Sequence, residues 1–243
     1  EGVVKLVSTS IENKYKITPQ QLESALSDRT RLFIFSSPCN PSGSVYSKEE
    51  LRALADVFKK FPNVYILSDE IYEYINFVGT HESIAQFDDI KDRVIIINGL
   101  SKGFAMTGYR LGYVAASPEV VKACEKLQGQ FTSGTNSITQ RAAITALTTD
   151  LKPTHEMVQE FERRKQFVIK AMCAIKGMQF AEPDGAFYFW VGTRGLARQG
   201  EGSLALCERL LAETGLALVP AFAFGDDEYF RISFAYPESR LRE

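Results

Sequence analysis

The chain has 243 residues, 45% of them hydrophobic and 24% charged, so it can bury a substantial core as one large domain or two smaller ones, and disordered and fibrous classes are excluded. Its net charge of −2, with Lys and Arg scattered along the chain, gives no reason to expect nucleic acid as a partner. No apolar run approaches the roughly 18 residues of a membrane span, so we expect no membrane contact and small molecules as partners.

Both ends of the sequence read as interrupted. The chain opens on EGVV rather than Met, a pattern typical of a strand inside a domain. At the other end, PESRLRE begins a helical pattern and stops before it completes an apolar face. We therefore expect a fragment that lacks its N-terminal part and its last helix.

Three apolar, β-favouring runs each end in polar residues. They are LFIFSS at 32–37, which breaks into the turn-rich PCNPSG, VYILS at 64–68 and VIIIN at 94–98. Between the first two, Ser47 and Glu50 form a capping box ahead of apolar residues at helical spacing. Strands that alternate with helices predict an α/β fold with a mostly parallel sheet covered on both faces.

The pattern continues to a boundary near residue 150. We expect a short strand at 112–117, a helix from Pro118 to about Gln128 and a helix from Ser137 towards Leu147. The polar stretch LKPTHE then separates a large domain, residues 1–150, from a smaller α+β domain, residues 151–243. In the smaller domain we predict two helices, at 157–174 and 203–214, and four strands, at 177–182, 186–191, 216–220 and 229–235.

The cysteine and histidine patterns predict no metal site. The four cysteines are widely spaced, without a CxxC pair or nearby histidines, so neither zinc nor a disulfide framework is indicated, and a reducing cytoplasm fits best. His81 and His155 occur in polar stretches without a partner pattern, and we expect both on the surface.

Three of the predicted strand ends deliver polar side chains to one edge of the sheet, where ligands bind in open α/β folds. These side chains are Asn40, Asp69 and Lys102. An amine condenses with an aldehyde, a carboxylate holds a ring nitrogen protonated and an amide reaches a phenolic oxygen, so the trio fits a pyridine-ring cofactor. A lysine taken alone at such a position is usually a solvated side chain.

The surroundings of Lys102 favour the cofactor over a solvated lysine. The small residues Gly99, Ser101 and Gly103 leave room for a bulky group against the backbone. Arg110, eight residues further on, offers a planar fork of donors to a phosphate.

The segment NGLSKGFAMTGYRLGY around Lys102 resembles the cofactor-lysine signature of class I, aspartate aminotransferase-like aminotransferases. NPSG at 40–43 and SDEIYEYI at 68–75 resemble two preceding motifs of that family in the same order, and the likeness covers nearly the whole chain. The resemblance implies fold type I of the pyridoxal-phosphate (PLP) enzymes and a homodimer when full length. It also implies that Lys102 carries PLP as a Schiff base.

The resemblance assigns further cofactor contacts. Asp69 pairs with the ring nitrogen, although alone it reads as the N-cap of a helix over EIYEYI. Tyr72, one helical turn on, donates its hydroxyl to the phenolic oxygen, as does the amide of Asn40, which alone reads as a turn residue. Several members have a phosphate-binding serine at the position of Gly99, and we assign that hydroxyl to Ser101.

Arg231 and the segment after Gln128 have two interpretations each. An outward-facing arginine is the ordinary interpretation of Arg231 in YFRISFA. The segment resembles the family's C-terminal strand, which implies that Arg231 grips the substrate α-carboxylate and that Asn40 also contacts the substrate. Thr132 and Ser133 either reach a phosphate across a dimer interface or cap the next helix, and we favour the cap.

The resemblance implies ping-pong transfer of an amino group between an L-amino acid and a 2-oxo acid, with aspartate and 2-oxoglutarate as the expected pair. Two other functions stay open. One is another fold type I enzyme, either a C–S lyase or a different amino-acid aminotransferase. The other is a non-catalytic ligand-sensing domain of a regulator. Substrate tests separate the first alternative, and the upstream gene sequence separates the second.

Overall fold

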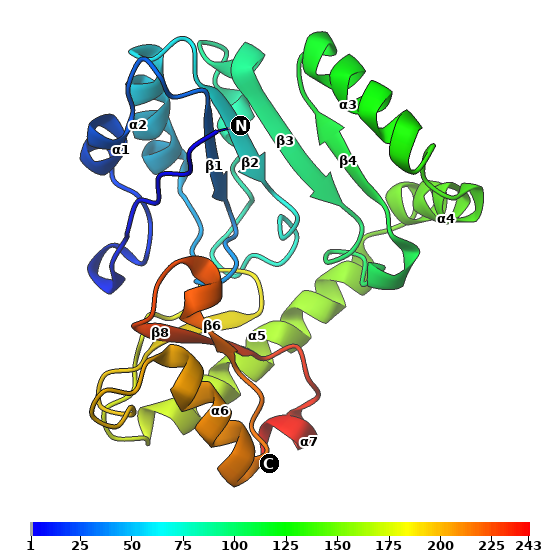
Figure 1. Cartoon of the computed structure of the whole chain (residues 1–243). Helices are drawn as coiled ribbons and strands as arrows, with labels where there is room; N and C mark the ends of the chain where they lie inside the picture. Colours follow the sequence, from blue (N-terminus) through cyan, green and yellow to red (C-terminus); the bar gives the residue numbers. More distant parts are fainter. Residues whose placement is uncertain (1) are drawn as a thin grey trace.

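The computed structural model describes residues 2–243, which form two sheets connected by a chain of three helices (Figure 1). The first sheet has the order β1-β2-β3-β4, with strands Leu32–Ser36, Tyr65–Asp69, Val94–Gly99 and Gly112–Ala115. The first three are parallel, as predicted, and β4 pairs antiparallel with β3. No long helix crosses over between β3 and β4, so the chain returns beside β3 in the opposite direction.

One face of this sheet carries the first core. Helices α1 (Pro19–Ala25) and α2 (Lys48–Lys59) cover it, and the strand side chains Phe33, Ile66 and Val94 lie side by side in register beneath them. On the opposite face, Leu32 is 45% and Ile34 64% exposed. Within the described residues, this face of β1 is therefore open.

Two capping boxes fix where α1 and α2 begin. The predicted box of Ser47 and Glu50 is confirmed, since each side chain binds the backbone N–H of the other. The same arrangement joins Thr18 and Gln21 at the start of α1. Helix α1 was not predicted, although the run Thr-Pro-Gln-Gln at its start contains the N-cap, the proline of the first turn and the N3 partner.

The second sheet is antiparallel throughout, in the order β5-β6-β8-β7. Its strands are Gln179–Phe180, Tyr188–Gly192, Tyr229–Ser233 and Val219–Pro220 in that spatial order. Helix α6 (Ser203–Thr214) has the predicted bounds, and the short α7 spans Glu238–Leu241. The second core contains buried side chains from both β6 and β8, among them Phe189, Val191 and Phe230.

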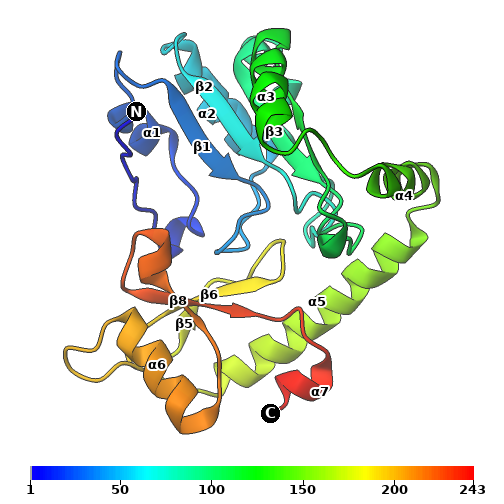
Figure 2. The same cartoon turned by 45° about the vertical axis from the view of Figure 1, so that its right-hand side comes forward.

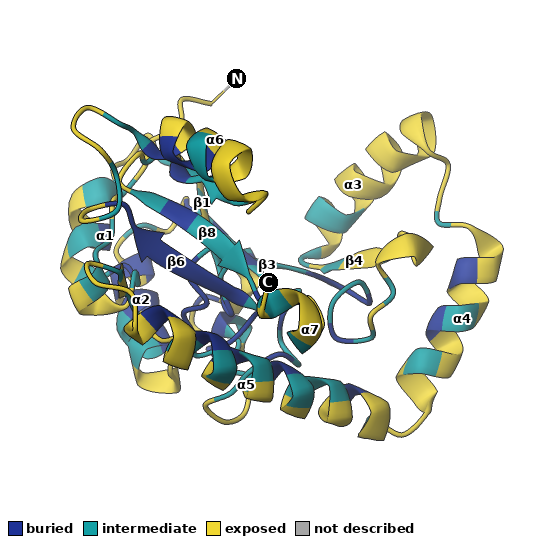
Figure 3. Cartoon of the chain, turned by 90° about the horizontal axis from the view of Figure 1, so that it is seen from below, coloured by how far each residue is buried: buried dark blue, intermediate teal, exposed yellow. Residues whose placement is uncertain are grey.

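Helices α3 (Pro118–Phe131), α4 (Ser137–Thr148) and α5 (Lys152–Cys173) connect the two sheets. Most of α3 and α4 is exposed (Figure 3), and α3 has no buried residue. The 22-residue α5 runs from α4 to the second sheet (Figure 2). The proposed boundary near residue 150 stays a prediction, and the two sheets lie on either side of it.

Two predicted elements are absent from the described residues. The strand expected at EGVV includes residue 1, which lies outside them, and residues 2–10 form no strand; Val3 is 98% exposed. EIYEYI forms turns instead of a helix. The backbone at the end of this segment forms hydrogen bonds with a distant loop. The Phe77 N–H donates to the Asp184 carbonyl, and the Ile75 carbonyl accepts from the Ala186 N–H. Within residues 2–243, no helix has both the length and the apolar character needed to cross a bilayer.

Candidate active site

The ends of β1, β2 and β3 meet at one edge of the first sheet. Ser36, Asp69 and Ile97 are partners in register across the three strands. Asn40 lies in the loop that follows β1, and Lys102 lies three residues beyond β3. Parallel pairing thus brings the three predicted strand-end residues to the same side of the molecule.

Lys102 lies half-buried against two aromatic rings. Its Nζ is 5.6 Å from the ring centroid of Tyr72 and 5.6 Å from that of Phe187. Burial lowers the pKa of the Lys102 amine, and the positive charges of Arg231 and Arg110 lower it further. Among residues 2–243, no side chain pairs with it by a hydrogen bond or an ion pair. The amine is therefore easier to deprotonate than a solvated lysine.

Asp69 closes a turn and does not cap a helix. Its Oδ1 accepts from the backbone N–H of Ile71 at 3.1 Å. Burial raises the pKa of Asp69, and the neighbouring carboxylate of Glu70 raises it further. A cation placed against Asp69 would reverse this shift, so the side chain suits a positively charged partner.

Tyr72 is 3% exposed and presents a protonated hydroxyl. Burial raises the pKa of this hydroxyl well above its ordinary value. The hydroxyl oxygen lies 2.9 Å from that of Tyr188 on β6, a residue of the other sheet. The ring of Tyr74, two residues on, packs against that of Phe104.

Arg231 reaches from β8 to the loop after β1. Its Nη1 donates to Oδ1 of Asn40 at 2.7 Å. The guanidinium lies 4.3 Å from the ring centroid of Tyr188 and 5.5 Å from that of Phe224. Its Nε is buried and has no hydrogen-bond partner in the described part of the chain. An outward-facing arginine is thus excluded, and Arg231 retains donors for an anionic group.

Arg110 and Ser101 have weaker links to this site. Arg110 is exposed, and its Nη1 donates to the carbonyl of Thr107 at 2.9 Å. It lines a groove of about 690 Å³ that includes Thr132 and does not include Lys102. No side-chain hydrogen bond joins Ser101 to another described residue. The phosphate-binding roles of Arg110 and Ser101 stay predictions.

The expectation that Thr132 or Ser133 caps the helix after this groove is wrong. Asn136, rather than Thr132 or Ser133, caps α4, because its Oδ1 accepts from the N–H groups of Ile138 and Thr139. Ser133 has a left-handed φ of 62°, and Thr132 is the C-cap of α3. The sequence signal was present, since asparagine directly before a helical run is a preferred N-cap.

Other residues of the chain fill the space beside Gly99 and Gly103, on either side of Lys102. A Cβ on Gly99 would lie 2.7 Å from the carbonyl oxygen of Leu111, and one on Gly103 would lie 2.5 Å from the ring of Tyr74. The expectation that both leave space for a cofactor is therefore wrong. They let the loop of Lys102 pack tightly against its neighbours.

Sequence reasoning also missed a buried polar cluster next to Asp69. Glu70 is 4% exposed, and its carboxylate accepts from Ser68 and Ser83 and lies 2.9 Å from His81 Nε2. The surface position expected for His81 is wrong, whereas His155 is exposed as predicted. A histidine eleven residues from its partner leaves no local spacing signal.

Comparison with known proteins gives a family match over the whole chain. A profile of the family described as aminotransferase class I and II matches residues 1–243. The chain is 41% identical, over 98% of its length, to a bifunctional aspartate aminotransferase and glutamate/aspartate-prephenate aminotransferase of Petunia hybrida, and covers 52% of it. It is 40% identical over its full length to an aspartate/prephenate aminotransferase of Nitrosomonas europaea, and covers 64% of that protein.

Solved structures show the same similarity in three dimensions. A double mutant of the Thermus thermophilus aspartate aminotransferase superposes with a TM-score of 0.92 at 35% identity, over 99% of this chain and 62% of that one. The Thermotoga maritima aspartate aminotransferase has a TM-score of 0.87 at 38% identity, over 99% of this chain and 61% of that one. The chain thus spans between half and two thirds of the length of these relatives.

Proposed function

The chain belongs to the class I and II aminotransferases, and on this basis we propose that the protein transfers an amino group between an L-amino acid and a 2-oxo acid. We take aspartate and 2-oxoglutarate as the pair, since several relatives are named for aspartate. The observation that carries the proposal is the half-buried amine of Lys102, which lies at the same edge of the sheet as Asp69. Burial lowers the pKa of this amine.

The donors around Lys102 fit PLP as the cofactor. Lys102 offers an amine, and Asp69 offers a carboxylate that a cation would ionise more fully. Tyr72 offers a protonated hydroxyl, and Asn40 keeps its amide nitrogen as a donor because its oxygen accepts from Arg231. When bound, PLP supplies an aldehyde for amines and a ring that accepts electrons from the substrate Cα.

Each residue then has a distinct task. Lys102 Nζ would hold the cofactor, and as a free amine it would move the proton of the substrate Cα. Asp69 would keep the ring nitrogen protonated, and Tyr72 with Asn40 would donate to the phenolic oxygen. Arg231 holds the α-carboxylate through the donors that Asn40 leaves free, which aligns Cα with Lys102.

We also propose that the protein works as a homodimer. The support is an apolar surface on α3 and α4 whose side chains are 52% to 84% exposed: Leu127, Phe131, Ile138, Ile144 and Leu147. Exposed apolar patches of this kind mark interaction surfaces. A second copy of the chain is the partner that this proposal names.

The test is an assay of the intact gene product with PLP and a panel of amino acids and 2-oxo acids. We expect exchange between aspartate and 2-oxoglutarate, and loss of exchange in Lys102→Ala. Lys165→Ala provides a control, since Lys165 is buried but is paired with Glu162 and Glu182. Release of ammonia or sulfide without exchange would favour a lyase, and ligand binding without any turnover would favour a sensor domain.

A further inference from the structure

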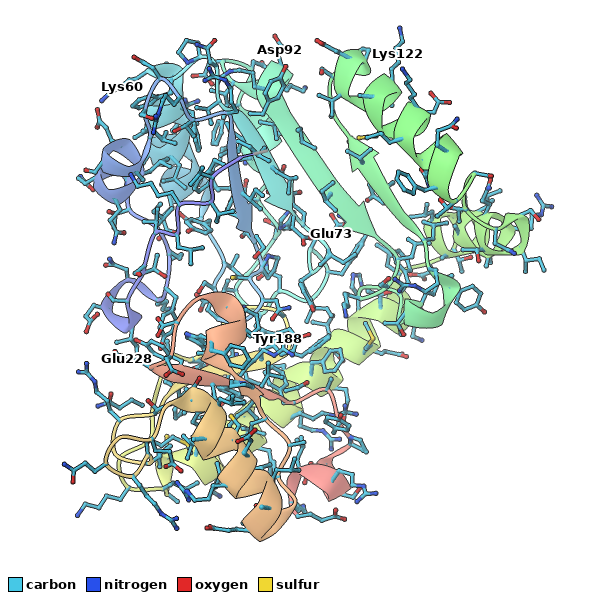
Figure 4. The ribbon with its side chains drawn as sticks, viewed as in Figure 1. Lys60, Glu73, Asp92, Lys122, Tyr188 and Glu228 are labelled. Carbon is cyan, nitrogen blue, oxygen red and sulfur yellow. The ribbon has the colours of Figure 1, made fainter. Side chains whose placement is uncertain are left out.

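Tyr188 touches two groups of the proposed site at once. It lies on β6, 7% exposed, where the second sheet meets the loops that follow the strands of the first (Figure 4). Its hydroxyl oxygen lies 2.9 Å from that of Tyr72, which comes from the loop after β2. The face of its ring lies 4.3 Å from the guanidinium carbon of Arg231, which comes from β8.

We propose that Tyr188 is a positioning residue that links the cofactor end of the site to its substrate end. Its hydroxyl directs the proton of Tyr72, and its ring seats the guanidinium of Arg231. The inference rests on the roles proposed above for Tyr72 and Arg231. Tyr188 itself would touch neither the cofactor nor the substrate.

The hydroxyl pair has a directional requirement. Each tyrosine hydroxyl has one proton and can also accept. If Tyr72 donates to Tyr188, its only proton is used and none remains for a phenolic oxygen. Tyr72 therefore serves the proposed cofactor only when Tyr188 is the donor. The positive charge of Arg231 over the Tyr188 ring favours this direction, because a donating hydroxyl gains negative character that the cation stabilises.

The ring contact has a second consequence, for Arg231. The guanidinium is bound on one side by Asn40 Oδ1 at 2.7 Å and rests on the Tyr188 ring at 4.3 Å. These contacts restrict the side chain, while its buried Nε stays without a partner in the described residues. A planar guanidinium held on an aromatic face is pre-organised for a carboxylate, so less freedom is lost when the carboxylate binds.

Two variants separate the hydroxyl from the ring. Tyr188→Phe removes only the hydroxyl, and Tyr188→Leu removes both. Tyr15→Phe is the matched control, since the Tyr15 hydroxyl lies 3.5 Å from the carbonyl of Trp190 and contacts neither Tyr72 nor Arg231. Trp190 is the single tryptophan and pairs with Arg231 across β6 and β8, so its fluorescence reports ligand binding beside Arg231.

The hydroxyl is tested by the pH at which the visible absorbance of PLP-loaded protein changes. We expect Tyr188→Phe to raise this pH by about half a unit or more, because Tyr72 no longer accepts the hydrogen bond that makes its own hydroxyl a stronger donor to the phenolic anion. Tyr15→Phe should leave it unchanged. An unchanged titration in Tyr188→Phe would overturn the role of the hydroxyl.

The ring is tested by titrating PLP-loaded protein with 2-oxoglutarate and following Trp190 fluorescence. We expect Tyr188→Leu to weaken binding by about fivefold or more, the size of a partly desolvated cation–π contact, and Tyr188→Phe to weaken it by less than about twofold. Equal affinities of Tyr188→Leu and the unaltered protein would overturn the role of the ring.

A cofactor-free measurement separates this inference from the proposed function. In urea unfolding of the apoprotein, Tyr72→Phe and Tyr188→Phe should each lower the midpoint, and the double variant should lower it no further than the larger single effect. Additive shifts would contradict the hydroxyl pair. If the protein takes up no PLP, the proposed function fails, and the unfolding cycle alone then decides whether the two hydroxyls are coupled.

Discussion

Burial shifts the ionisation of three side chains at the edge of the first sheet. It lowers the pKa of Lys102 and raises those of Asp69 and Tyr72, so each shift favours the uncharged form. An uncharged amine is a nucleophile, and an uncharged phenol is a hydrogen-bond donor. For Asp69, by contrast, a nearby cation would stabilise the ionised carboxylate that burial disfavours. This side chain therefore suits a protonated ring nitrogen.

Asp69→Asn tests that charge without disturbing the turn. Asparagine keeps the Oδ1 that accepts from Ile71 N–H, so only the negative charge is lost. We expect PLP still to be taken up at Lys102 and turnover to fall by about three orders of magnitude, the size of effect seen for a lost electrostatic partner. Asp150→Asn is the control, since Asp150 Oδ1 accepts from Lys152 N–H in the same pattern and has no hydrogen bond to a residue of the site. Turnover close to that of the unaltered protein would reduce Asp69 to a turn residue.

Arg231→Lys tests the carboxylate grip. Lysine keeps the charge and loses both the planar fork and its seat on Tyr188. We expect kcat/KM to fall by about a hundredfold for every amino acid, whatever its side chain, because all share the α-carboxylate. Arg194→Lys, at a side chain that is 76% exposed, should have no effect. A loss confined to acidic amino acids would show that Arg231 binds a different carboxylate.

The residues of this site differ in how far the sequence predicts them. Lys102, Asp69 and Asn40 follow strands that continuous apolar runs define, so their strand-end positions follow from local patterns. The contact of Tyr188 with Tyr72 joins residues 116 apart, and that of Arg231 with Asn40 joins residues 191 apart. No local pattern encodes such pairs, because only the packing of β6 and β8 against the first sheet brings them together.

At the scale of elements, tertiary contacts decide where sequence periodicity fails. EIYEYI has a helical pattern, yet Asp69 Oδ1 accepts from the N–H of Ile71, and the Ile75 carbonyl accepts from the N–H of Ala186 in the loop before β6. These bonds replace the i→i−4 bonds of a helix. The capped helix α2 and the apolar strands β1, β2 and β3 were predictable, because their caps and apolar patterns agree with the packing.

Gly43 fixes one contact between the two halves of the chain. Its carbonyl accepts from the N–H groups of Asp184 and Gly185, and it has a φ of 71°. A Cβ at Gly43 would lie 2.3 Å from Cβ of Pro183. Alanine at Gly43 would therefore meet both backbone strain and a steric clash.

We expect Gly43→Ala to lower the free energy of unfolding by about 3 kcal/mol, the sum of left-handed strain and overpacking. Gly200→Ala is the matched control, because Gly200 has a φ of 77° and no atom within 4 Å of the added Cβ. It should cost only about 1 kcal/mol of strain. If urea unfolding shows the same loss of unfolding free energy for Gly43→Ala and Gly200→Ala, the loop of Gly43 moves away from Pro183 without an energetic cost.

For the whole molecule, the two cores leave α3 and α4 outside. Neither helix contributes to the two core clusters, and Phe131 and Ile138 are 84% and 76% exposed. The sequence predicted both helices correctly and did not reveal this exposure, since an amphipathic pattern does not say which surface covers the apolar face. The domain boundary and the cytoplasmic location stay predictions.

The proposed dimer is tested on those two side chains. We expect the double variant Phe131→Asp, Ile138→Asp to weaken self-association by at least about tenfold, since two charges would enter an apolar interface. Sedimentation equilibrium measures this constant. Val78→Asp, at a residue that is 60% exposed in another part of the chain, is the control. A monomeric unaltered protein, or a dimer insensitive to both charges, would contradict the proposal.

Borohydride labelling is the most direct test of Lys102 as the residue that holds PLP. Borohydride reduces a C=N bond between a lysine and PLP to a stable secondary amine, so the labelled residue can be found by peptide mapping. We expect one label, on Lys102, and no label in Lys102→Ala. A label on any other lysine, or PLP bound tightly without a reducible bond, would contradict it.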